Sequence, residues 1–86
     1  MEREQFHYHV DIMSVDARLL DSSEPLPKAA AERLFRQKVE EFRPQVGRFV
    51  IRPANESDWE ERGLVGAVRV ATNHRLIISL TRCDCD

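Results

Sequence analysis

The sequence predicts a small single α+β domain spanning residues 1–86, in which a mainly antiparallel sheet of about four strands packs on one long helix. Apolar residues alternate with polar ones in several short stretches, and one central stretch has helical spacing. A chain of 86 residues is too short to divide its apolar residues between two cores. The hydrophobic fraction of 42% excludes the disordered class. The expected order is strand, helix, strand, short helical turn, strand, strand.

The first strand is predicted near the N-terminus, where a period of two gives one inward set: Phe6, Tyr8, Val10 and Ile12. The apolar alternation then continues on odd numbers at Val15, Ala17 and Leu19. A bulge near residues 13–14 would absorb this one-residue shift. The alternative is a break into two short strands, which is disfavoured because the Gly or Asn of a tight hairpin is missing.

The helix is predicted over residues 27–43. Pro27 suits the first helical position, because its missing N–H has no helical partner there. Apolar residues then recur at helical spacing: Ala31, Leu34, Phe35, Val39 and Phe42. The residue before a proline avoids helical angles, so we expect the helix to end at Arg43, before Pro44.

A second strand is predicted over residues 48–52, after Gly47. A helical turn follows, because Ser57 and Glu60 have the spacing of a capping box, in which each residue bonds the backbone of the other. Around the single Trp59, this turn carries a cluster of acidic side chains: Glu56, Asp58, Glu60 and Glu61.

The last two strands, over residues 64–71 and 76–81, are predicted as a hairpin. A three-residue loop over 73–75 would give an apolar face without charge, and this register predicts a core centred on Phe35, Val39, Phe42, Val68, Val70, Ile78 and Leu80. The opposite face would then contain Val65, Ala67, Arg69, Ala71 and Ile77. One helix cannot cover both faces, so we expect a binding partner or a second copy of the chain to cover the second one.

Composition and motifs argue against most chemistry. The net charge of -2 lacks the positive field of non-specific nucleic-acid binders. The apolar runs are too short for a membrane span or a secretory signal, so we expect a cytoplasmic protein. The sequence contains neither a glycine-rich phosphate loop nor a nucleophile elbow, and so short a chain seldom encloses a substrate cleft. We therefore expect neither an enzyme nor a cofactor.

Two groups of metal-ligand side chains are present, and neither predicts a metal site. His7, His9 and Asp11 share one strand face, where neighbours are about 6 to 7 Å apart, whereas metal ligands normally come from more than one element. Cys83 and Cys85 do not fill a tetrahedral site, and a disulfide between them would close a strained, tiny loop. We expect residues 83–86 to be a frayed tail.

These observations favour a protein-binding module that acts by occupying the surface of a partner protein, with a homodimer as a further expectation. The candidate contact residues are Trp59, Asp58, Glu60, Glu61, Val65, Ala67, Arg69 and Ile77. An acidic rim around an aromatic side chain favours a basic partner, including a host complex that normally holds nucleic acid. By size and composition, the chain fits small inhibitors encoded by phages or mobile elements, such as anti-CRISPR proteins.

The alternative is a nucleic-acid-binding module. Its phosphate contacts would be arginines of the helix and sheet, namely Arg33, Arg36, Arg43, Arg48, Arg52 and Arg69. Phe6 or Tyr8 would stack on bases. This reading is the weaker one, because both aromatics are in phase with the predicted core and the net charge is negative.

Overall fold

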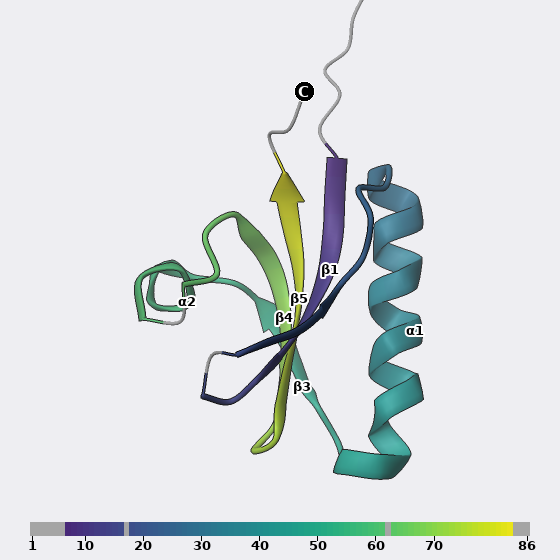
Figure 1. Cartoon of the computed structure of the whole chain (residues 1–86), viewed down its shortest axis with the longest axis vertical. Helices are drawn as coiled ribbons and strands as arrows, with labels where there is room; N and C mark the ends of the chain where they lie inside the picture. Colours follow the sequence, from purple (N-terminus) through teal and green to yellow (C-terminus); the bar gives the residue numbers. More distant parts are fainter. Residues whose placement is uncertain (1–6, 17, 62, 84–86) are drawn as a thin grey trace, which may run out of the picture.

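The computed structural model describes residues 7–16, 18–61 and 63–83, and over these it contains one five-stranded sheet and one long helix (Figure 1). The elements in chain order are β1 (His7–Ser14), β2 (Leu19–Ser22), α1 (Lys28–Val46), β3 (Val50–Pro53), α2 (Glu56–Glu61), β4 (Ala67–Thr72) and β5 (Leu76–Cys83). The strand order is β2-β1-β5-β4-β3, and every neighbouring pair is antiparallel. The predicted α+β class is confirmed, with β2 as the additional strand.

The first predicted strand is in fact a hairpin, so the disfavoured alternative is the correct one. β1 ends at Ser14, and the chain turns back into β2. The Ser14 N–H donates to the Arg18 carbonyl at 2.9 Å, and the Ser14 hydroxyl accepts the Arg18 N–H at 3.2 Å. These bonds close the turn without Gly or Asn. The register shift occurs opposite Ile12 and Met13, with Leu20 as the extra residue of β2.

The helix α1 continues beyond its predicted end at Arg43. Pro44 lies inside the last turn, and α1 ends at Val46. Gly47, at a φ of 100°, follows the helix and donates its N–H to the Arg43 carbonyl at 2.8 Å. Val46 packs against the core, and this contact favours the extension over a stop before the proline. Pro27 is the N-cap rather than the first helical residue.

One face of the sheet is covered by α1 (Figure 1). The helix contributes Ala31, Phe35 and Val39 to this first core, which they form together with the buried strand residues Val10, Ile12, Ala71, Leu76, Ile78 and Leu80. The predicted core residues Phe35, Val39, Ile78 and Leu80 are therefore confirmed, and Phe42 packs at the margin. Because β1 and β5 are adjacent, the apolar stripe of α1 lies over the middle of the sheet.

The hairpin of β4 and β5 has a different register from the predicted one. Thr72 pairs with Ile77, so Ala71 pairs with Ile78 and lies on the α1 face. Asn73 closes this turn: its side-chain oxygen accepts the N–H groups of Arg75 and Leu76 at 2.7 and 2.8 Å, and its own N–H donates to the Leu76 carbonyl at 3.1 Å.

In this register, several residues lie at other positions than the sequence predicts. Arg69 pairs with Leu80 and is half-buried. Val70 pairs with Ser79 and lies on the face away from α1. Val68 is 41% exposed and is not a core residue. The prediction of a face with Val68 and Val70 but without charge is therefore wrong, because Asn73 bonds Leu76 across the turn and the pairing of the two strands is shifted by one residue.

A second, smaller core lies on the face away from α1. Its buried residues are Met13, Leu64, Ala67, Val70 and Ile77, with Ala54 packed against them. The segment between β3 and β4 supplies both Ala54 and Leu64, and Figure 1 shows its helix α2 on the opposite side of the sheet from α1. The chain thus covers part of its second face by itself.

The C-terminal part of the sheet includes Cys83, which pairs with His7 as the last residue of β5. The expected frayed tail therefore does not include Cys83, because the strand pairing extends that far. Cys85, Phe6 and Ala17 lie outside the described residues. In the part of the chain that is described, no helix is long and apolar enough to cross a membrane.

Candidate protein-binding site

The candidate contact residues do not form one surface. Ala67 and Ile77 are 3% and 4% exposed in the second core, and Asp58 is 1% exposed. Arg69 is half-buried beside Leu80, on the other face of the sheet. The expectation that a partner or a second copy covers the face of Ala67 and Ile77 is corrected, because the segment between β3 and β4 already covers these side chains. Exposed candidates remain around α2: Trp59, Glu60, Glu61 and Val65.

The short helix α2 begins with a capping box, but not with the predicted one. The Asp58 N–H donates to the Asn55 side-chain oxygen at 3.1 Å, and the Asn55 N–H donates to Asp58 Oδ2 at 2.9 Å. This reciprocal pair has the geometry that the sequence assigned to Ser57 and Glu60. The sequence therefore predicted the capping box correctly but placed it two residues too late, because Asn55 is also a strong capping residue.

Asp58 also anchors α2 to the edge strand β3. Arg52 donates from Nη1 to Asp58 Oδ2 at 2.8 Å and from Nη2 to Oδ1 at 2.9 Å. The hydrogen bonds to Asp58 and the attraction of its charge raise the pKa of Arg52, although desolvation opposes them. This paired geometry holds a charge inside the fold at a fixed position. Asp58 is therefore a positioning residue of the site rather than part of its surface.

Trp59 has a fixed orientation and is partly exposed. Its indole N–H donates to the Ala67 carbonyl at 3.0 Å, which holds the ring at the start of β4. The side chain is nevertheless 40% exposed. A hollow of about 340 Å³ lies beside it, lined by Ala54, Asn55, Glu56 and Trp59. The Trp59 surface is defined here as these four residues together with Glu60 and Glu61.

The return of the chain from α2 into β4 depends on one glycine. Gly66 has a φ of 90°, and its carbonyl accepts the Arg82 N–H at 2.9 Å. A Cβ atom at this position would lie 2.9 Å from the Arg82 carbonyl oxygen. Both the backbone angle and this close approach require glycine, so β5 helps to fix the segment that carries Trp59.

The helix that carries Trp59 also carries exposed charge. Glu56, Glu60 and Glu61 are exposed, and none of them makes a hydrogen bond or ion pair with another described residue. Val65, which follows α2, is 69% exposed. The site thus combines a hollow beside an aromatic side chain with negative charge that no described residue pairs.

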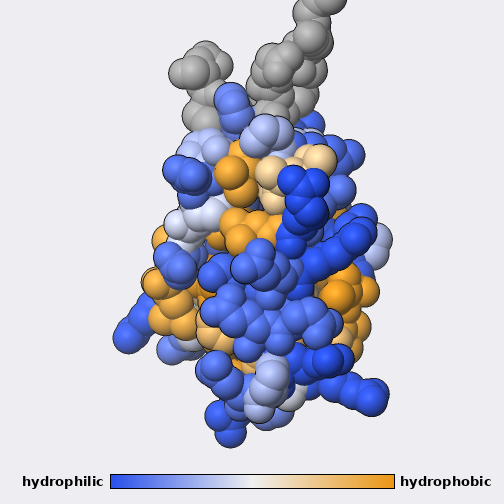
Figure 2. All heavy atoms as spheres, turned by 90° about the vertical axis from the view of Figure 1, so that its right-hand side faces the viewer, coloured by the Kyte–Doolittle hydropathy of each residue, from blue (hydrophilic) through white to orange (hydrophobic). Residues whose placement is uncertain are grey.

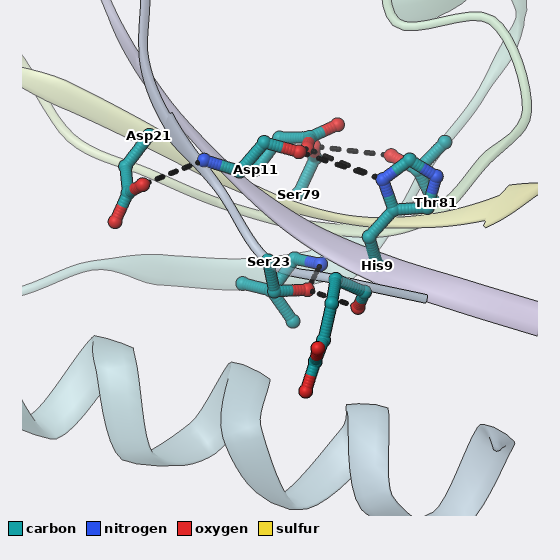
Figure 3. Close-up of polar contacts among 9 residues, drawn as sticks. His9, Asp11, Asp21, Ser23, Ser79 and Thr81 are labelled. Carbon is teal, nitrogen blue, oxygen red and sulfur yellow. Dashed lines mark hydrogen bonds and ion pairs between the residues drawn. The ribbon is translucent and has the colours of Figure 1, made fainter. Parts of the chain in front are cut away.

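A second polar group lies on β1, β2 and β5, on the sheet face away from α1. The Ser22 hydroxyl donates to Asp11 Oδ1 at 2.6 Å, and His9 Nδ1 lies 3.7 Å from the same oxygen. Figure 3 shows His9 and Asp11 beside the hydroxyl pair Ser79 and Thr81, whose oxygens are 3.2 Å apart.

This polar group does not have the geometry of a nucleophilic triad. Ser22 and Asp11 both face Nδ1 of His9, with Ser22 Oγ at 3.5 Å. A triad needs the serine and the carboxylate at opposite ring nitrogens. Across the described residues, no three His, Cys, Asp or Glu side chains come together in a way that could hold a metal ion.

The arginines of the alternative hypothesis do not form one continuous patch. Arg33, Arg36 and Arg43 are exposed on α1, where Arg43 pairs with Glu40 at 3.0 Å. Figure 2 shows the hydrophilic outer surface of the α1 side, with apolar areas at both flanks. Arg52 is bound by Asp58. Tyr8 packs against the first core and is not an open stacking platform.

No family model, no curated protein and no solved structure matches this chain. The geometry of the Trp59 surface is therefore the basis of the functional argument.

Proposed function

We propose that the chain is a protein-binding module that occupies a partner's surface through the Trp59 surface. The observation that carries the proposal is the exposure of a tryptophan whose orientation is already fixed. The ring is held by its bond to the Ala67 carbonyl, and its helix is held by Arg52 and Asp58. Tryptophan is among the residues most enriched at binding hot spots, and a side chain ordered in advance loses less entropy on binding.

The charge around Trp59 supports a basic partner. Three exposed glutamates lie on the same short helix as Trp59, and Arg52 on the neighbouring strand is already paired with Asp58. Acidic side chains at the margin of an interface accelerate association with a positive surface and disfavour negative ones. The proposed partner is therefore a protein with a basic surface, such as one that normally holds nucleic acid. Occupying that surface would inhibit the partner, which is the mode of action proposed for this chain.

Capture by matched variants tests the proposal. The parent, Trp59→Ala, Glu60→Lys and the control Leu20→Ala are immobilised and exposed to lysate of the native host. Leu20 is also an exposed apolar residue, but it lies on the opposite edge strand of the sheet. We expect one protein to bind the parent and the control and to be lost with the other two variants. Its affinity for Trp59→Ala, measured with purified partner, should fall at least tenfold.

Glu60→Lys separates a binding effect from a folding effect. Glu60 is exposed and makes no bond with another described residue, so its replacement leaves the second core intact. Circular dichroism of each variant checks the fold. If the purified partner binds Trp59→Ala and Glu60→Lys as tightly as the parent, the Trp59 surface is not the contact surface.

A further inference from the structure

The hollow beside Trp59 has the size and lining of a receptor for a single side chain. Its volume of about 340 Å³ lies at the lower end of small-ligand pockets, which span roughly 300 to 1,000 Å³. Ala54 and Asn55 line it directly after β3, while Glu56 and Trp59 line it from α2, three positions apart on that helix. A helix or a sheet does not fit such a space, whereas one extended side chain does.

The polar atoms of the lining determine which ligand is suitable. The indole N–H of Trp59 is used by the Ala67 carbonyl, and the Asn55 side-chain oxygen is used by the Asp58 N–H. What remains open is the exposed part of the indole ring, the Glu56 carboxylate and the side-chain NH₂ group of Asn55, and only the carboxylate carries a charge. The face of an aromatic ring carries partial negative charge, and tryptophan attracts cations more strongly than the other aromatic residues do.

The charges of the described residues disfavour an anionic occupant. Glu56 has no ion-pair partner among the described residues, and Glu60 and Glu61 add further negative charge on the same short helix. Among the described residues, Arg52 of the neighbouring strand makes two hydrogen bonds with Asp58 and does not line the hollow. An aromatic face next to an uncompensated carboxylate is complementary to a cation with an apolar stem.

We infer that the hollow beside Trp59 receives one arginine or lysine side chain of the partner protein, with the cation on the indole face and paired with Glu56. This inference rests on the proposed function and specifies the chemistry of the partner. A guanidinium group fits better than an ammonium group, because it is planar, stacks on the ring and bonds a carboxylate with two N–H groups.

Fluorescence of the full chain tests the inference, because Trp59 is the only tryptophan and so reports on this site alone. The probes are capped hexapeptides in which glycine alternates with arginine, with lysine or with citrulline, the neutral counterpart of arginine. We expect a saturable change in emission with the arginine peptide, a weaker one with the lysine peptide and none with the citrulline peptide. Added salt should weaken binding, because the paired charges are exposed.

Two variants locate the charge that binds the probe. Glu56→Gln should weaken binding of the arginine peptide about two- to fivefold, the range of an exposed ion pair. Glu24→Gln is the matched control: Glu24 is also exposed, but it lies in the loop before α1. The Glu24→Gln variant should bind the arginine peptide with the same affinity as the parent. A loss of equal size in both variants would show a general attraction to negative charge and would overturn the inference.

The result also separates this inference from the proposed function. If the citrulline peptide changes Trp59 emission as strongly as the arginine peptide, the hollow does not select a cation. If the captured partner is then still lost with Trp59→Ala but retained with Glu56→Gln, the Trp59 surface binds its partner through apolar contact, and the proposed function stands while this inference fails. If the arginine peptide binds but Trp59→Ala captures the partner normally, the proposed contact surface fails instead.

Discussion

The two faces of the sheet are covered by different physical means. On one face, α1 buries a periodic apolar stripe that includes Phe35. On the other face, a short segment is held largely by directed polar contacts: the Asn55 cap, the Arg52 ion pair with Asp58 and the bond from Trp59 to the Ala67 carbonyl. Burial of apolar area stabilises the fold on the first face, whereas the polar contacts of the second face fix the positions of individual side chains.

This difference explains why the exposed tryptophan is found where it is. A helix as short as α2 does not form alone in water, so its position depends on the contacts made by its ends and by Asp58. Those contacts satisfy polar atoms without requiring that Trp59 be buried. The face held by polar contacts can therefore present a rigid aromatic surface, whereas the face covered by α1 uses its large side chains for stability.

The largest expected effect is on the α1 face. Phe35→Ala should lower the free energy of unfolding by about 3 to 5 kcal/mol, because it removes a fully buried ring at the centre of the first core. Urea denaturation followed by far-UV circular dichroism measures this loss. The neighbouring exposed residue provides the control: Arg36→Ala should change stability by less than about 0.5 kcal/mol. If the two variants are equally stable, the helix does not contact the sheet as described.

A smaller but substantial effect is expected on the other face. Asp58→Ala should lower the free energy of unfolding by about 3 kcal/mol, since it leaves Arg52 without its carboxylate and removes one partner of the Asn55 capping box. The emission of Trp59 should shift to longer wavelength as its segment loosens. Glu60→Ala is the control, because Glu60 is exposed on the same helix. Unchanged emission in Asp58→Ala would show that the ion pair does not position Trp59.

The sequence predicted the elements whose signal is periodic. The spacing of Ala31, Phe35 and Val39 identified α1 and its buried side, and the paired apolar runs identified the hairpin of β4 and β5. It did not predict details that single side chains decide. Asn73 sets the register of one hairpin, the Ser14 side chain closes the turn of another without a glycine, and α1 continues past a proline to the packed Val46.

The site was predicted in part, for the same reason. Trp59 and its acidic neighbours are visible as residue types in one short segment. The role of Asp58 is not visible there, because Arg52 approaches it only once β3 and α2 are folded together. Ala67 and Ile77 were assigned to an open surface because their burial depends on Leu64, whose position no periodic pattern indicates.

The smallest expected effect distinguishes the observed capping residue, Asn55, from the predicted one, Ser57. Asn55→Ala should lower the free energy of unfolding by about 1 kcal/mol, because Asn55 accepts the Asp58 N–H at the start of α2. Ser57→Ala should change it by less than about 0.5 kcal/mol, because Ser57 is exposed and lies one position inside the helix. Thermal unfolding of both variants, followed by Trp59 emission, compares them directly. A larger loss for Ser57→Ala than for Asn55→Ala would restore the cap that the sequence predicted and would require a different start for α2. The expected order, with the larger loss for Asn55→Ala, would show that the polar contacts of this face begin at Asn55, which lines the hollow.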